Sequence, residues 1–77
     1  MKTYELKAAR VRLGYTAQAV ADYLGVVRQT YVAKERGIRS FSDKEKLMLT
    51  DLLKLTYDQF NLIFYNGELP YGHEAVD

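Results

Sequence analysis

The positions of the glycines and of the single proline constrain the fold most, because glycine is the only strong helix breaker before that proline. The one proline is Pro70, and the glycines stand at positions 14, 25, 37, 67 and 72. Glycine ends helices because it adopts the left-handed conformation without steric cost, and proline ends them because it lacks a backbone donor. The pattern therefore favours short helices joined by tight turns.

Apolar residues at helical spacing predict the first two helices, and a helix-compatible composition that ends at Gly37 predicts the third. Thr3 is the expected cap of the first helix and Thr16 of the second, because a threonine oxygen accepts a hydrogen bond from an unpaired backbone N–H. Val27 stands at the cap position of the third and has no side-chain acceptor. The expected helices cover about residues 4–13, 17–24 and 28–36.

Two capping boxes predict the remaining helices. Ser42 and Glu45 form the first box, so a helix begins one residue after Ser42. Thr56 and Gln59 repeat the pattern ahead of a helix over 57–65. The fourth helix has too many apolar residues for one narrow stripe, so we expect it to be central to the core. These residues are Leu47, Met48, Leu49, Leu52, Leu53 and Leu55.

Five helices and no confident strand predict an all-α fold. A chain of 77 residues has room for one small domain, which buries only about 60% of its unfolded surface. Asn66 and Gly67 are typical of a turn, and Leu69-Pro70 cannot continue a helix. We therefore predict a helical domain over 1–66 and a short extended tail over 67–77.

The chain has few residues suited to catalysis or metal binding. The chain has no cysteine, which excludes disulfides and cysteine-ligated zinc. The one histidine, His73, has only Glu74 beside it, and no nucleophile has a recognisable base. We therefore expect no enzyme, metal, cofactor or small-molecule substrate. Since no apolar run approaches the roughly 18 residues of a membrane helix, we expect a cytoplasmic protein with no membrane partner.

The net charge of +1 conceals an uneven distribution. Residues 1–54 contain all eleven lysines and arginines and six acids, whereas residues 55–77 contain four acids and no lysine or arginine. A basic body with an acidic tail is a mild indication of a polyanionic partner, and it also occurs in small domains without function.

Two short helices joined at Gly25 match the helix-turn-helix unit. The chain resembles the Cro and C1-repressor-like (Xre-type) helix-turn-helix family of phage and bacterial regulators over about residues 4 to 60. The resemblance implies a compact, lambda-repressor-like five-helix domain whose third helix lies in the major groove of operator DNA. The matching segments are 6–10, 15–16, 20–26, 28–31 and 35–37.

The third helix then presents a plausible base-reading face, with Tyr31 directed to the core. Arg28 matches guanine O6 and N7, and Gln29 matches adenine N6 and N7. Either Val32 or Ala33 suits a thymine methyl group. The face consists of Arg28, Gln29, Val32, Ala33 and Arg36.

Further residues are candidates for phosphate contacts, which set register without identifying bases. We expect these contacts at Thr16, Gln18, Arg39, Lys44 and Lys46. The chain departs from the family where Ala17 replaces a phosphate-contacting glutamine and where Val27 replaces serine or threonine. Lys34 replaces a bulky apolar residue, so it either extends its ammonium to solvent or pairs with an acid.

These departures support an alternative function. Ala17, Val27, Val32 and Ala33 form a small apolar patch with an arginine rim, which is typical of protein–protein interfaces. The alternative is an antirepressor or modulator that binds a partner repressor protein, and an antitoxin-like module shares the same fold.

A homodimer is a further expectation, because two-fold operators bind dimers. One interpretation of the C-terminal aromatic cluster is a dimer interface, and the other is a cap on the chain's own core. The cluster consists of Phe60, Phe64, Tyr65 and Tyr71.

Overall fold

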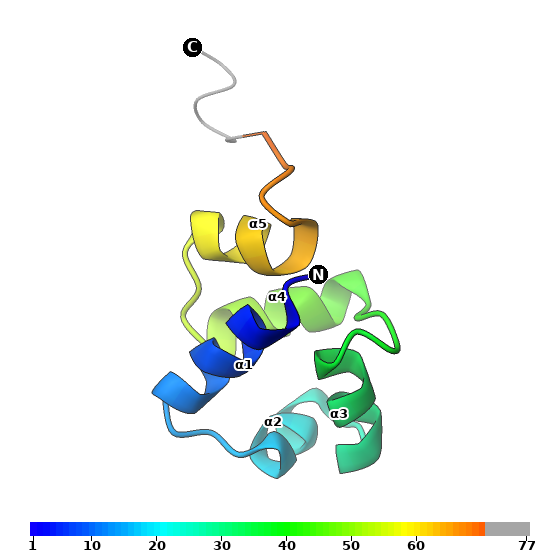
Figure 1. Ribbon diagram of the computed structural model, residues 1–77. Coiled ribbons are helices and arrows are strands. Elements are labelled where there is room, and N and C mark those ends of the chain that lie inside the picture. Colours follow the sequence, from blue (N-terminus) through cyan, green and yellow to red (C-terminus); the bar gives the residue numbers. More distant parts are fainter. Residues whose placement is uncertain (71–77) are drawn as a thin grey trace.

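The computed structural model describes residues 1–70 as five helices with no strand (Figure 1), which confirms the predicted all-α class. Helices α2 and α3 lie at the opposite end of the molecule from α5, with α1 and α4 between them. No helix in this part of the chain is long and apolar enough to cross a bilayer. The helices are α1 (Thr3–Arg12), α2 (Ala17–Leu24), α3 (Arg28–Glu35), α4 (Asp43–Leu52) and α5 (Tyr57–Tyr65).

Most predicted caps are present. The Thr16 hydroxyl accepts from the backbone N–H of Ala19 at 3.0 Å. Both capping boxes form, ahead of α4 and α5, and Val27 gives α3 no side-chain cap. The expected Thr3 cap is wrong, because Lys2 takes the cap position and Thr3 is already helical. Helix α3 is one residue shorter than expected, since Arg36 is its C-cap.

Each helix contributes the buried side chains of one face to the core. Its fully buried members include Leu6, Val20, Tyr31 and Leu49. Helix α4 contributes the fully buried Leu49 to the core, whereas Leu47 is 66% exposed. Leu47 lies two residues from Leu49, about 200° around the helix, so burying one exposes the other.

An ion pair joins α3 to α4. The Lys34 ammonium donates to both carboxylate oxygens of Glu45 at 2.7 and 2.8 Å, which is the second of the two alternatives expected for Lys34. Burial alone would raise the pKa of Glu45, but the bonds from Lys34 and from the Ser42 backbone outweigh it and lower that pKa. The capping glutamate of α4 thus also fixes the C-terminal half of α3.

The segment that follows α5 is tied back onto that helix. The buried Asn61 amide donates to the Leu69 carbonyl and accepts from the Leu69 N–H, both at 2.9 Å. The Tyr57 hydroxyl donates to the Pro70 carbonyl. The chain therefore packs on α5 up to Pro70, beyond the predicted boundary at 66, and the rest of the predicted tail lies outside the described residues.

Candidate nucleic-acid interface

Helix α3 has one face in the core and one on the surface. Tyr31 and Glu35, one turn apart, are 0% and 7% exposed. Arg28 and Gln29, in its first turn, are exposed. Gln29 lies about 200° around the helix from Tyr31, so the burial of Tyr31 turns Gln29 to solvent. Arg28 is on the same side as Glu35 and is exposed in the first turn.

A buried cluster holds α3 against α1. Arg10 donates to Glu35 through Nε at 2.8 Å and through Nη2 at 3.3 Å, and the Tyr31 hydroxyl donates to the same carboxylate at 2.7 Å. The hydrogen bond with Glu35 raises the pKa of Arg10, and burial raises the pKa of Tyr31. Arg10 also donates to the Tyr15 carbonyl at 2.8 Å, so one guanidinium ties α1, the following loop and α3 together.

Sequence reasoning did not find this ion pair, although the signal is present. Arg10 is four residues after Leu6 on the apolar stripe of α1, and Glu35 is four residues after Tyr31 on the buried stripe of α3. Opposite charges on two inward faces indicate a buried pair, because a lone buried charge is very unfavourable.

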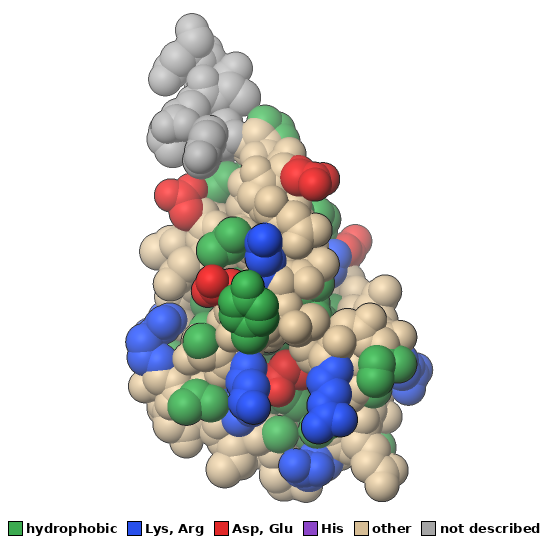
Figure 2. Space-filling view, viewed as in Figure 1, with side chains coloured by type: hydrophobic (Ala, Val, Ile, Leu, Met, Phe, Trp, Pro, Cys, Tyr) green, Lys and Arg blue, Asp and Glu red, His purple; other side chains and the backbone are tan. Residues whose placement is uncertain are grey.

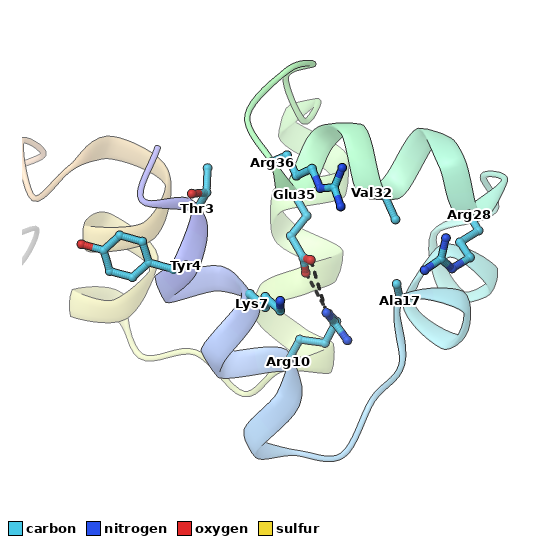
Figure 3. Close-up of a pocket in the computed structure, with 9 residues that line it drawn as sticks. All are labelled: Thr3, Tyr4, Lys7, Arg10, Ala17, Arg28, Val32, Glu35 and Arg36. Atoms are coloured by element: carbon cyan, nitrogen blue, oxygen red, sulfur yellow. Dashed lines mark hydrogen bonds and ion pairs between the residues drawn. The ribbon is translucent and has the colours of Figure 1, made fainter.

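A cleft of about 310 Å³ opens between α1 and α3 beside this pair. Lys7, Arg28 and Arg36 stand around it, and Ala17 and Val32 supply its apolar wall (Figure 3). Basic side chains gather over this end of the molecule in Figure 2. The carboxylate in the lining belongs to Glu35, which already accepts from Arg10 and Tyr31. The cleft is therefore positively charged.

The structure brings together three of the five residues predicted to read bases. Arg28, Val32 and Arg36 line the cleft, whereas Gln29 is exposed beside it and Ala33 is half-buried. The predicted site contains none of the four lining residues that α1 contributes, which are Thr3, Tyr4, Lys7 and Arg10.

The predicted phosphate contacts fall into two groups. Arg39 and Lys44 are exposed, and their side chains make no hydrogen bond or ion pair within residues 1–70. Three already have partners: the Thr16 hydroxyl caps α2, the Gln18 amide donates to Asp22 at 2.8 Å, and the Lys46 ammonium donates to Tyr65 at 3.0 Å.

The aromatic residues predicted as a dimer face pack on their own chain. The ring centroids of Phe60 and Phe64 are 5.3 Å apart, and those of Phe60 and Tyr65 are 5.7 Å apart. Phe64 is 8% exposed and offers almost no surface to a second chain, and Tyr71 lies outside the described residues. These rings close the core, and a dimer stays a prediction.

Comparison with known families agrees with this geometry. A family model described as helix-turn-helix matches residues 6–60, which is well over half of the chain. No curated protein and no solved structure matches the chain. The match supports a DNA-binding regulator, since this family is one of DNA-binding regulators and is typically non-enzymatic. The chain thus belongs to the Cro/C1-type helix-turn-helix family.

Proposed function

We propose that the protein is a sequence-specific transcription regulator of the phage Cro and repressor type, which reads the DNA major groove with α3. The observation that carries the proposal is the exposed pair Arg28 and Gln29 in the first turn of α3, beside a positively charged cleft. A recognition helix contacts bases with its N-terminal residues, so these two side chains are in the required place.

The chemistry of this surface suits duplex DNA. The Arg28 guanidinium matches guanine O6 and N7, and the Gln29 amide matches adenine N6 and N7. Half-buried Val32 and Ala33 stand one turn further along α3 for a thymine methyl group. Exposed cations at Arg39 and Lys44 suit the flanking phosphates, which hold the protein in register.

The experiment that tests this function is selection from a pool of random duplexes during a salt titration. Enrichment of one short site, with affinity that falls steeply as salt rises, supports a regulator that recognises sequence. Equal, weak retention of every duplex removes the claim of sequence specificity.

We expect Arg28→Ala and Lys44→Ala to affect DNA binding differently. Arg28→Ala should cost about 1–3 kcal/mol at the selected site and relax the preference at one base pair. Lys44→Ala should weaken all duplexes alike and lower the salt slope by about one. Fluorescence anisotropy on the selected and a scrambled duplex measures both, with Arg12→Ala, an exposed arginine outside the cleft, as the control. A loss equal on both duplexes for Arg28→Ala contradicts base recognition.

A second candidate function is modulation of a partner repressor protein. Val27 is 66% exposed at the start of α3, and Ala17 and Val32 form the apolar wall of the cleft. An apolar centre with arginines at its rim is typical of a protein interface, so this surface also suits another protein.

The variant Val32→Glu tests whether the apolar wall of the cleft binds a partner repressor. If a repressor of the same family binds here, a carboxylate on the apolar wall should weaken the complex at least about tenfold, because it must be desolvated at an apolar contact and draws the rim arginines Arg28 and Arg36 to itself. Isothermal titration calorimetry measures the complex, and circular dichroism checks that the variant is folded. Val11→Glu, on an exposed part of α1, is the matched control. An unchanged complex rejects this interface.

A further inference from the structure

A second hollow lies where the N-terminal residues meet the end of α3, the loop that follows it, α4 and α5. Its volume is about 480 Å³, within the range of roughly 300–1,000 Å³ that is usual for small-molecule sites. Three cationic side chains and no carboxylate line it, namely those of Arg36, Arg39 and Lys46. The hollow thus concentrates positive charge that nothing in its own lining neutralises.

The three cations are available to a ligand in different ways. Arg36 and Arg39 are exposed, and their side chains make no hydrogen bond or ion pair with any residue from 1 to 70. Lys46 is held in place, since its side chain is only 18% exposed and its ammonium lies 4.5 Å from the centre of the Tyr65 ring. Its nearest carboxylate, that of Asp43, is 3.9 Å away and 95% exposed. An ammonium has three donors, and Tyr65 takes one of them.

Neutral side chains complete the lining. The hydroxyls of Thr3 and Ser40 add further donors, and the buried rings of Phe41 and Phe64 give an apolar floor. Gly37 closes one wall: its φ is +81°, and a Cβ there would lie 3.2 Å from the Thr3 methyl carbon. The space is therefore a hollow with one side open to solvent and with an apolar floor.

We propose that this hollow binds the phosphate group of a small phosphorylated molecule. Two guanidinium groups and an ammonium match an oxyanion, because charge-assisted hydrogen bonds to phosphate are about twice as strong as neutral ones. A phosphate of the DNA backbone has the same chemistry. The volume and the apolar floor favour the free molecule, since a backbone phosphate occupies only the rim of such a space.

The site also bears on DNA binding. Arg36 lines both this hollow and the cleft between α1 and α3, so a ligand that engages its guanidinium removes a cation from the cleft. This step rests on the proposed function. It predicts that the ligand weakens DNA binding more than sodium chloride of the same ionic strength does.

The test uses inorganic pyrophosphate and the full chain without DNA. Calorimetry at constant ionic strength should show saturable binding, and amide resonances of residues 37–41 should shift. We expect Lys46→Gln to weaken binding about tenfold. Arg39→Gln should act in the same direction, and it guards against misfolding because Arg39 lies on an exposed loop. Lys54→Gln removes the same charge from an exposed lysine outside the hollow and should bind like the wild type.

Three results overturn the proposal. The first is no saturable binding of pyrophosphate to the wild type. The second is an equal loss in Lys46→Gln and Lys54→Gln, which would reduce the effect to net charge. The third is that Lys46→Gln lowers the affinity for DNA but leaves pyrophosphate binding unchanged. That result would mean that the cations bind a phosphate of the DNA backbone. A protein that binds pyrophosphate but no DNA would instead reject only the proposed function.

Discussion

Replacing Glu35 with alanine is expected to lower the free energy of unfolding by about 3–5 kcal/mol, because it leaves the buried Arg10 guanidinium without a counterion. The side chains of this pair are 10% and 9% exposed, so water compensates little of the loss. A domain of 77 residues has roughly 4–12 kcal/mol of stability in total, so the loss is a large fraction of it and should clearly lower the midpoint of denaturation. Urea denaturation followed by circular dichroism at low temperature measures the difference.

A control at the same site distinguishes the effect of one unpaired buried charge from the effect of removing both charges. A triple variant, Arg10→Met with Glu35→Leu and Tyr31→Phe, removes both charges and the hydroxyl that would lose its acceptor. Apolar replacements of a buried ion pair are often neutral or stabilising, so the triple variant should recover most of the stability. A triple variant as unstable as Glu35→Ala would show that shape, rather than an unpaired charge, causes the loss.

Leu49→Ala is expected to cost about 2–5 kcal/mol, because it removes three carbon atoms from a site that is 0% exposed and leaves a cavity. Leu47→Ala makes the same chemical change two residues earlier, at a position that is 66% exposed, and should change stability by less than about 0.5 kcal/mol. The two midpoints of urea denaturation give the comparison. Similar losses in both variants would contradict the orientation of α4.

Leu49→Ala also tests how stability relates to recognition. Its methyl groups lie in the core, away from the exposed face of α3. The folded fraction should therefore keep the base preference of the wild type while its apparent affinity falls. A changed preference would mean that α4 sets the position of α3 more directly than the ion pairs do.

Local chemistry explains which parts of the fold the sequence predicts well. The bonds of Ser42 with Glu45 and of Thr56 with Gln59 join residues three positions apart, so the amino-acid types are enough to predict them. The pairing of Arg10 with Glu35 spans 25 positions and depends on how two helices pack. Periodicity shows that both charges face inward, but it cannot bring them together.

The same distinction between local and long-range contacts applies to the candidate site. Helical spacing predicts the exposure of Gln29, which lies about 200° around the helix from the buried Tyr31. Arg28 lies within about 60° of Tyr31, so its exposure in the first turn of α3 does not follow from spacing. The cleft cannot be predicted in this way, because α1 contributes Tyr4 and Lys7 to it, more than twenty residues from Arg28. The hydrogen bond from Lys46 to Tyr65 is also beyond prediction from the sequence, because it joins residues 19 positions apart.

The clamp that Asn61 makes on Leu69 fixes where the polypeptide leaves the domain. In Figure 1 this exit point lies at the end of the molecule remote from α2 and α3. A fluorophore or fusion partner attached beyond residue 70 therefore starts from the side of the domain remote from α2 and α3. Asn61→Leu would release that exit point while leaving α3 untouched, so the point of attachment and the α3 surface can be engineered separately.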